Sequence, residues 1–149
     1  MQKTIELDSL TFADMLRQGT VSLSQDKNAI NDLNVFPIPD GDTGDNMLMT
    51  LKAGCNALKN HLGTLSELAS AASSGMLLGA RGNSGVILSR IFAGLAKGLQ
   101  GAITADTLIF AKAMDAAVTE AYKPFPCLSK APSSPCCAKA WRALMSKVT

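Results

Sequence analysis

The stretch LNVFPIPDGDTGDNM, Leu33–Met47, interrupts the helical pattern of this 149-residue chain with two prolines followed by three aspartates. Neither proline fits inside a helix, because proline lacks an N–H group and restricts the residue before it. Asp40, Asp42 and Asp45 stand within six residues of one another, so their like charges repel. The stretch is therefore either an ordinary Asp-Gly turn or a loop that holds a cation.

The composition favours a single helical domain. The chain is 47% hydrophobic but only 5% aromatic, and its length is sufficient to bury a core. Neither a signal peptide nor a membrane span is visible, so we expect a soluble, cytoplasmic protein. The basic C-terminal tail would suit an anionic partner, but it offers neither an amphipathic helix nor aromatic-interleaved basic repeats, so no nucleic-acid partner is expected.

Apolar residues recur at helical spacing in five segments, which predicts an all-α protein without strands. The helices are expected at residues 11–33, 45–58, 65–77, 84–99 and 106–122. Their expected N-caps include Asp45, Thr64 (with Glu67 completing a capping box), Ser84, and Thr104 or Asp106.

A second informative stretch is GARGNSG, Gly79–Gly85, which directly precedes an apolar helix. Glycine allows a close approach of the backbone to a ligand, and a helix start offers free N–H groups, so this pattern suits phosphate. A tight turn between two helices, with Ser84 as the N-cap, explains the same residues. Taken alone, the stretch leaves both interpretations open.

The aspartates suit a magnesium ion. Asp40 and Asp42 flank one glycine and offer the hard oxygen ligands that Mg²⁺ prefers. A calcium-binding EF-hand is excluded, because the sixth position of the loop is Asp45 rather than glycine and the twelfth is Leu51 rather than glutamate. The only histidine, His61, is expected to cap a helix end rather than to bind a metal.

Together, the two stretches resemble a known family. NDLNVFPIPDGDTGDNM, followed about thirty residues later by GARGNSGVILSRIF, is similar to the DhaL-type nucleotide-binding domain. That family includes the L subunit of dihydroxyacetone kinase and the N-terminal domain of bacterial fatty acid kinase. The resemblance covers roughly residues 8 to 122, and the sequence LNVFPIPDGDTG is most similar to the fatty acid kinase branch.

The resemblance implies a fold and an activity. The fold is an antiparallel helical barrel of about eight helices, of which about five are expected in this chain. The site binds ATP or ADP with two Mg²⁺ ions. The activity is ATP-dependent phosphoryl transfer to a fatty acid presented by a separate lipid-binding subunit. The alternative acceptor is dihydroxyacetone, bound by the K subunit of dihydroxyacetone kinase.

The resemblance also implies roles for individual residues. Asp40 and Asp42 match the metal-binding aspartates, and Asn34 takes the place of a further aspartate in the dihydroxyacetone kinase branch. The residues expected to contact the nucleotide are Thr43, Gly44, Asn46, Gly82, Asn83, Ser84 and Gly85. No general base is identified.

The resemblance ends near Tyr122, where the composition changes. Nine Lys/Arg and twelve Asp/Glu precede Lys123, whereas five Lys/Arg and no acidic residue follow from there. Three of the four cysteines lie in this tail without metal-site spacing. Where the tail begins, the fatty acid kinase branch continues with a sequence like AVSxPVEGTILTV.

Back-translation suggests an origin for the tail. With one base restored after the Lys123 codon, residues 123–149 can be read as KAVSMPVEGTILTVLREGVESAHEQSD. We therefore expect residues 1–122 to be an incomplete DhaL-type domain, followed by a frameshifted tail that is either genuine or a sequencing error. Such a chain is expected to have uncovered apolar helix faces and impaired kinase activity, or to be a non-functional fragment.

Overall fold

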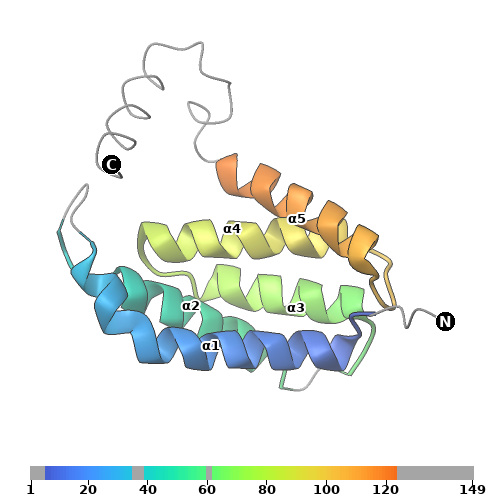
Figure 1. Ribbon diagram of the computed structural model, residues 1–149, viewed down its shortest axis with the longest axis horizontal. Coiled ribbons are helices and arrows are strands. Elements are labelled where there is room, and N and C mark those ends of the chain that lie inside the picture. The colour runs from blue at the N-terminus through green and yellow to red at the C-terminus, as the bar shows by residue number, and fades with distance from the viewer. Residues whose placement is uncertain (1–5, 35–38, 60–61, 124–149) are drawn as a thin grey trace, which may run out of the picture.

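The structure, a computed structural model, describes residues 6–34, 39–59 and 62–123. The expectations for residues 124–149 and for His61, together with the first of the two loop prolines, lie outside the described residues. The described chain forms five helices and no strand: α1 (Ser9–Asp32), α2 (Thr43–Ala57), α3 (Leu65–Leu78), α4 (Gly82–Gly98) and α5 (Thr107–Tyr122) (Figure 1). The predicted all-α class and the five helices are confirmed.

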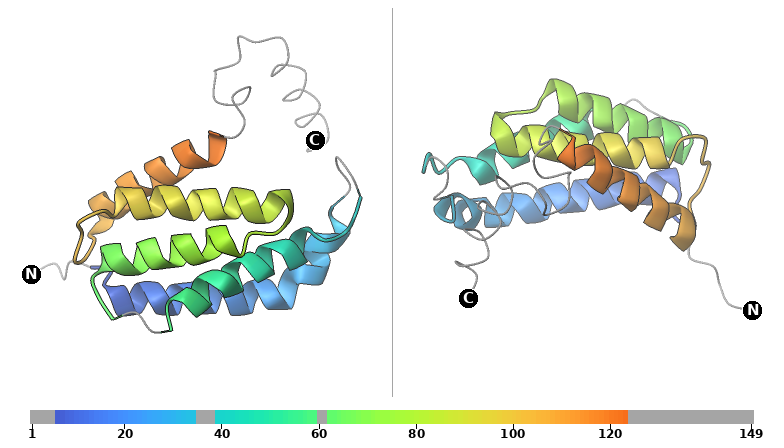
Figure 2. Two further views of the ribbon diagram at one scale, coloured as in Figure 1. Left: turned by 180° about the vertical axis from the view of Figure 1, so that it is seen from behind. Right: turned by 90° about the horizontal axis from the view of Figure 1, so that it is seen from above.

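Successive helices run antiparallel and pack side by side (Figures 1 and 2). In addition, α2 contacts α4 and α1 contacts α3, whereas α5 contacts only α4 among the described helices. An antiparallel order brings the end of α1 and the starts of α2 and α4 to the same end of the bundle, at the left of Figure 1. Both motifs of the sequence analysis lie at this end.

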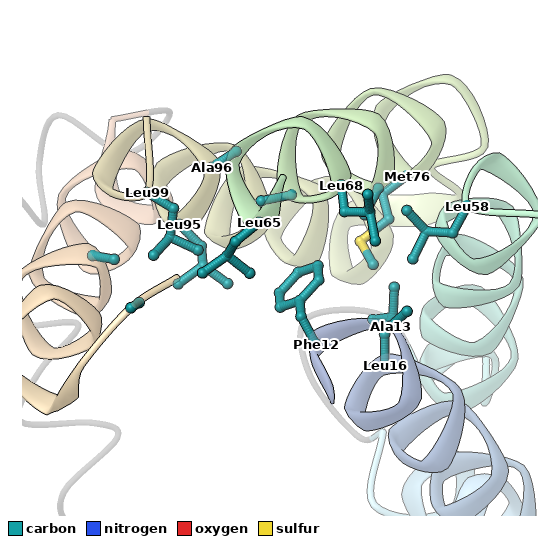
Figure 3. Close-up of a cluster of buried hydrophobic side chains, with 14 of the residues drawn as sticks. Phe12, Ala13, Leu16, Leu58, Leu65, Leu68, Met76, Leu95, Ala96 and Leu99 are labelled. Atoms are coloured by element: carbon teal, nitrogen blue, oxygen red, sulfur yellow. The ribbon is translucent and has the colours of Figure 1, made fainter. Parts of the chain in front are cut away.

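The core lies between α1, α2, α3 and α4, where large apolar side chains meet alanines (Figure 3). Leu65, Met76 and Leu99 are fully buried, and Phe12 and Leu16 of α1 belong to the same core cluster. These residues recur at helical spacing, so each helix turns one apolar face inward. Burial of this apolar surface is the main favourable contribution to folding.

Two of the expected helix starts are confirmed. In α3, the Glu67 N–H donates to Thr64 Oγ1 (3.3 Å) and the Thr64 N–H donates to Glu67 Oε2 (2.8 Å), which completes the capping box. In α5, the carboxylate of Asp106 accepts from the N–H of Ile109 at 2.8 Å. Both caps act within three residues, so local sequence was sufficient to predict them.

Two other expected helix starts are wrong. Asp45 does not cap α2, because the helix begins at Thr43 with Asp42 in the N-cap position. Ser84 does not cap α4, because that helix begins at Gly82 after Arg81. Neither Asp42 nor Arg81 makes a capping hydrogen bond with its side chain. Neither helix is therefore capped by the side chain of the residue before it.

Helix α5 has apolar side chains on two sides. Ala113 and Ala117 pack against α4 and are buried. On its other side, α5 exposes Leu108, Met114, Val118 and Tyr122, which are 62%, 43%, 54% and 45% exposed. Because α5 contacts only α4, no other described helix covers this apolar side.

None of the helices described in the structure combines the length and the apolar character that crossing a membrane requires.

Candidate nucleotide and metal site

The two motifs meet where α2 and α4 begin. Thr43 is the first residue of α2, and Ser84 lies in the first turn of α4. The hydroxyl of Ser84 lies 3.4 Å from the carbonyl oxygen of Thr43, to which it donates across a separation of 41 residues. The described part of the aspartate loop (residues 39–42) and the glycine-rich turn (residues 79–85) are therefore parts of one region (Figure 1).

A buried threonine joins the two helices behind this region. Thr50 has no exposed surface, and its hydroxyl donates to the carbonyl of Asn46 at 2.8 Å. The same oxygen accepts from the N–H of Arg81 at 3.4 Å, immediately before α4. Because an unpaired buried hydroxyl is costly, these two bonds favour one position of the glycine-rich turn relative to α2.

The glycines of the turn are required by this close packing. A Cβ on Gly85 would lie 2.4 Å from Thr50 Oγ1, and a Cβ on Gly82 would lie 2.4 Å from Asn46 Nδ2. Gly82 also has a φ of +58°, in the left-handed region that favours glycine. Residues 79–85 thus form a tight connection between helices, which leaves the start of α4 close to the aspartate loop.

The start of α2 is held by α1. The side-chain oxygen of Asn31 accepts from the N–H groups of Gly44 (2.7 Å) and Asp45 (3.3 Å). Asn31 Nδ2 donates to Asp45 Oδ2 at 2.8 Å, and Lys27 Nζ pairs with Asp45 Oδ1 at 2.7 Å. The hydrogen bond from Lys27, followed by that from Asn31, lowers the pKa of Asp45. Asp45 therefore ties α2 to α1 instead of capping its own helix.

The start of α4 differs, because its first N–H groups lack such a partner. Within the described part of the chain, the N–H groups of Gly82, Asn83 and Ser84 make no hydrogen bond, and the first N–H bonded to the backbone is that of Gly85. Gly82 and Asn83 are exposed. Free N–H groups and the partial positive charge of a helix start favour an anion such as phosphate.

The expected metal ligands precede α2 in the chain, and Asp42 is its N-cap residue. Asp40 and Asp42 are exposed, and no lysine or arginine in the described ranges pairs with either carboxylate. Asn34 Nδ2 donates to Asp40 Oδ1 at 2.5 Å, so these two ligand candidates lie together. Among the described residues, no group of three or more His, Cys, Asp or Glu side chains is placed to hold a metal. Two exposed carboxylates without a described lysine or arginine partner, together with an amide oxygen, are nevertheless a donor set that fits Mg²⁺, which retains several waters.

Comparison with known proteins identifies the family of this chain. The sequence profile of the DAK2 domain matches residues 37–126, which include the aspartate loop and the glycine-rich turn. The chain belongs to the DAK2 domain family. This is the DhaL-type domain of the sequence analysis, so the resemblance stated there is confirmed.

Relatives with the same DAK2-type sequence are much longer proteins. Protein YloV of Bacillus subtilis is 45% identical over 118 residues, which are 78% of this chain and 21% of YloV. Uncharacterized proteins of Staphylococcus saprophyticus and Staphylococcus epidermidis are 44% and 43% identical over 119 residues, 79% of this chain and 22% of each relative. The chain thus spans about a fifth of the length of the curated relatives that it matches.

Membership in the DAK2 family assigns a general biochemical class. The domain is associated with kinases, and its DhaL-type members bind ADP or ATP. In this DAK2 domain, the structure brings together the first turns of α2 and α4, which contain all seven residues expected to contact the nucleotide: Thr43, Gly44, Asn46, Gly82, Asn83, Ser84 and Gly85.

The sequence analysis missed three residues that organise this region of the DAK2 domain, namely Lys27, Asn31 and Thr50. A signal exists for the first two: they are four residues apart near the end of α1, so they lie on one face of that helix. Thr50 carries no such signal, because its partners come from two separate segments.

Proposed function

We propose that this DAK2 domain is the ATP- and Mg²⁺-binding part of a kinase that transfers the γ-phosphate of ATP to a fatty acid. The observation that supports the proposal is that Asp40 and Asp42, which pair with no described lysine or arginine, directly precede α2, whose first residue is bonded to the first turn of α4, where three N–H groups are unbonded. A metal–nucleotide complex needs both, because its cation prefers oxygen ligands and its phosphates prefer N–H donors.

Each part of the region then has a role. Asp40, Asp42 and Asn34 would hold Mg²⁺, which neutralises phosphate charge when it is bound. The N–H groups of Gly82, Asn83 and Ser84 would bind phosphate oxygens, and Thr43 and Asn46 would border the same space. Such a site acts by positioning and charge stabilisation, so it needs no general base on this chain.

The acceptor is proposed from the family branch. The sequence LNVFPIPDGDTG is most similar to the fatty acid kinase branch, in which a separate lipid-binding subunit presents the fatty acid. We place the reaction in the cytoplasm. Because the chain spans only about a fifth of its relatives, the activity belongs to the whole kinase, of which this domain supplies the nucleotide site.

Calorimetric titration of ATP into the full chain, with and without Mg²⁺, tests the nucleotide site. Binding is expected to require Mg²⁺ and to weaken at least tenfold, about 1.4 kcal/mol, in an Asp40→Ala/Asp42→Ala variant. The matched control is Asp26→Ala/Asp115→Ala, which removes two exposed carboxylates elsewhere and should bind ATP as the wild type does. A helical wild-type sample that binds no ATP, or a site variant that binds it normally, would refute the proposal.

The acceptor is tested by phosphate transfer from labelled ATP once binding is established. Labelled phosphate on a fatty acid held by a lipid-binding partner supports the proposal. Transfer to dihydroxyacetone in the presence of the K subunit, and not to fatty acid, would replace it with the alternative branch.

A further inference from the structure

We infer that Asn31 is a positioning residue, which holds the aspartate loop in the conformation required for metal-dependent nucleotide binding. This inference rests on the proposed function, because it names the residue that orients the proposed ligands. Asn31 does not itself belong to the expected ligand set; it acts through the first turn of α2.

The geometry gives one side chain three bonds to the first turn of α2. The oxygen of Asn31 accepts two backbone N–H groups, from Gly44 and Asp45, and its nitrogen donates to the carboxylate of Asp45. An amide is suited to this task because it offers an acceptor and a donor on one planar group. Lys27, one turn earlier on α1, pairs with the other oxygen of Asp45.

The backbone leaves little freedom at the same point. A Cβ on Gly44 would lie 2.4 Å from the carbonyl oxygen of Lys27, so the start of α2 lies directly against α1. Displacing the first turn of α2 would therefore break its three bonds with Asn31 and this close contact together. The packing and the hydrogen bonds favour the same single arrangement.

The loop is consequently held by two asparagines, Asn34 just after α1 and Asn31 within α1. Before the loop, Asn34 donates to Asp40 at 2.5 Å. After the loop, Asn31 bonds the N–H of Gly44, two residues beyond Asp42. Residues that orient metal ligands without touching the metal commonly change metal affinity by about 10- to 100-fold. Asn31 occupies such a place.

Asn31 also determines which of the two helix starts has N–H groups available for an anion. Because its oxygen uses the N–H groups of Gly44 and Asp45, an anion cannot take these two donors at α2. The corresponding groups of α4 make no bond within the described residues. The arrangement therefore directs phosphate toward α4 and leaves the α2 side to the carboxylates and their cation.

An exchange of the side chains at positions 31 and 45 tests the inference. The Asn31→Asp variant replaces the hydrogen bond from Asn31 to Asp45 with two carboxylates that repel each other. Mg²⁺-dependent ATP binding is therefore expected to weaken about tenfold or more. In the double variant Asn31→Asp/Asp45→Asn, donor and acceptor exchange places and the bond re-forms. The double variant should bind within about threefold of the wild type, a margin well below the tenfold loss.

The matched control is Asp106→Ala, which removes the cap bond to the N–H of Ile109 at the start of α5. This variant is expected to lower the melting temperature, as loss of any helix cap does, without changing ATP affinity. A wild-type affinity in Asn31→Asp would overturn the inference. So would a double variant as weak as the single one, or an equal loss of affinity in Asp106→Ala.

Hydrogen exchange separates this inference from the proposed function. In Asn31→Ala, the backbone N–H groups of Gly44 and Asp45 lose their acceptor, so they should exchange about tenfold faster, while that of Ile109 is unchanged. If the wild type binds no ATP, the proposed function fails, and exchange alone decides whether Asn31 holds the loop. Unchanged exchange at both N–H groups would overturn the inference, whatever the wild type binds.

Discussion

Gly82 and Gly101 both have left-handed backbones, with φ of +58° and +78°, but their surroundings differ. A Cβ on Gly82 would lie 2.4 Å from Asn46 Nδ2, at the junction of α2 and α4. A Cβ on Gly101 would meet nothing within 4 Å. A side chain at either position would therefore strain the left-handed backbone. Only at Gly82 would it also clash with a residue of the candidate site.

Substitution of each glycine by alanine distinguishes the effect of backbone strain from the effect of the clash with Asn46. We expect Gly82→Ala and Gly101→Ala each to lose about 1–2 kcal/mol of unfolding free energy, because alanine disfavours the left-handed region. Only Gly82→Ala should also weaken ATP binding, since it displaces Asn46 and the start of α4. Urea unfolding and calorimetric titration of both variants check this; equal ATP affinities would show that the glycine-rich turn does not contact the nucleotide.

At the scale of helices, the contact between α4 and α5 depends on small residues. A Cβ on Gly94 would lie 2.4 Å from the carbonyl oxygen of Ala116, and one on Gly98 would lie 2.3 Å from the Cα of Ala113. The obstructing atoms are backbone, so they cannot move without shifting a whole helix. The pair is also joined by Glu120, whose carboxylate pairs with Lys97 at 2.6 Å. Hydrogen bonds from Lys123 and from Lys97 lower the pKa of Glu120 to about 2.

Two glycine-to-alanine changes distinguish this contact from helix propensity. Gly94→Ala should lower the free energy of unfolding by about 1–3 kcal/mol, because it overpacks the α4–α5 contact. Gly19→Ala, in α1 with nothing within 4 Å of the added Cβ, should raise it by about 0.5–1 kcal/mol, because alanine favours a helix interior. Urea midpoints measure both changes. An increase in stability for both variants would mean that α5 does not pack on α4 as described.

At the scale of the whole molecule, three observations meet near the end of α5. Helix α5 contacts only α4 among the described helices and exposes an apolar side. The match to the DAK2 domain ends at residue 126. Lys123 begins the part of the chain that has no acidic residue. The end of the family match and the change in composition thus lie within a few residues of each other.

We propose that the reading frame changes at the Lys123 codon. Determination of the DNA sequence through this codon is expected to show that one added base restores a continuation reading AVSMPVEGTILTV. Such a continuation would supply apolar residues to a domain whose last described helix is uncovered on one side. An intact frame, with no such reading in either alternative frame, would contradict the proposal.

Local sequence was sufficient where both partners of an interaction lie within one turn. The capping box of Thr64 and Glu67 and the cap at Asp106 each join residues three apart, and both were predicted. The N-cap positions of α2 and α4 were each predicted three residues too late, at Asp45 and Ser84 instead of Asp42 and Arg81. Asp45 instead bonds Lys27 and Asn31, which are 18 and 14 residues away. No local rule distinguishes these two uses of a carboxylate near a helix start.

The sequence by itself determined the class of this protein, namely five amphipathic helices and membership in the DAK2 family, and it contains two motifs whose residue types suit a metal and a phosphate. Only the tertiary structure decided how the two helix starts are used. At the start of α2, the N–H groups of Gly44 and Asp45 donate to the side chain of Asn31, whereas those at the start of α4 remain unbonded within the described residues. The reason is physical: helix formation follows from residues within one turn, whereas the bond that closes α2 forms only after packing has brought α1 against it.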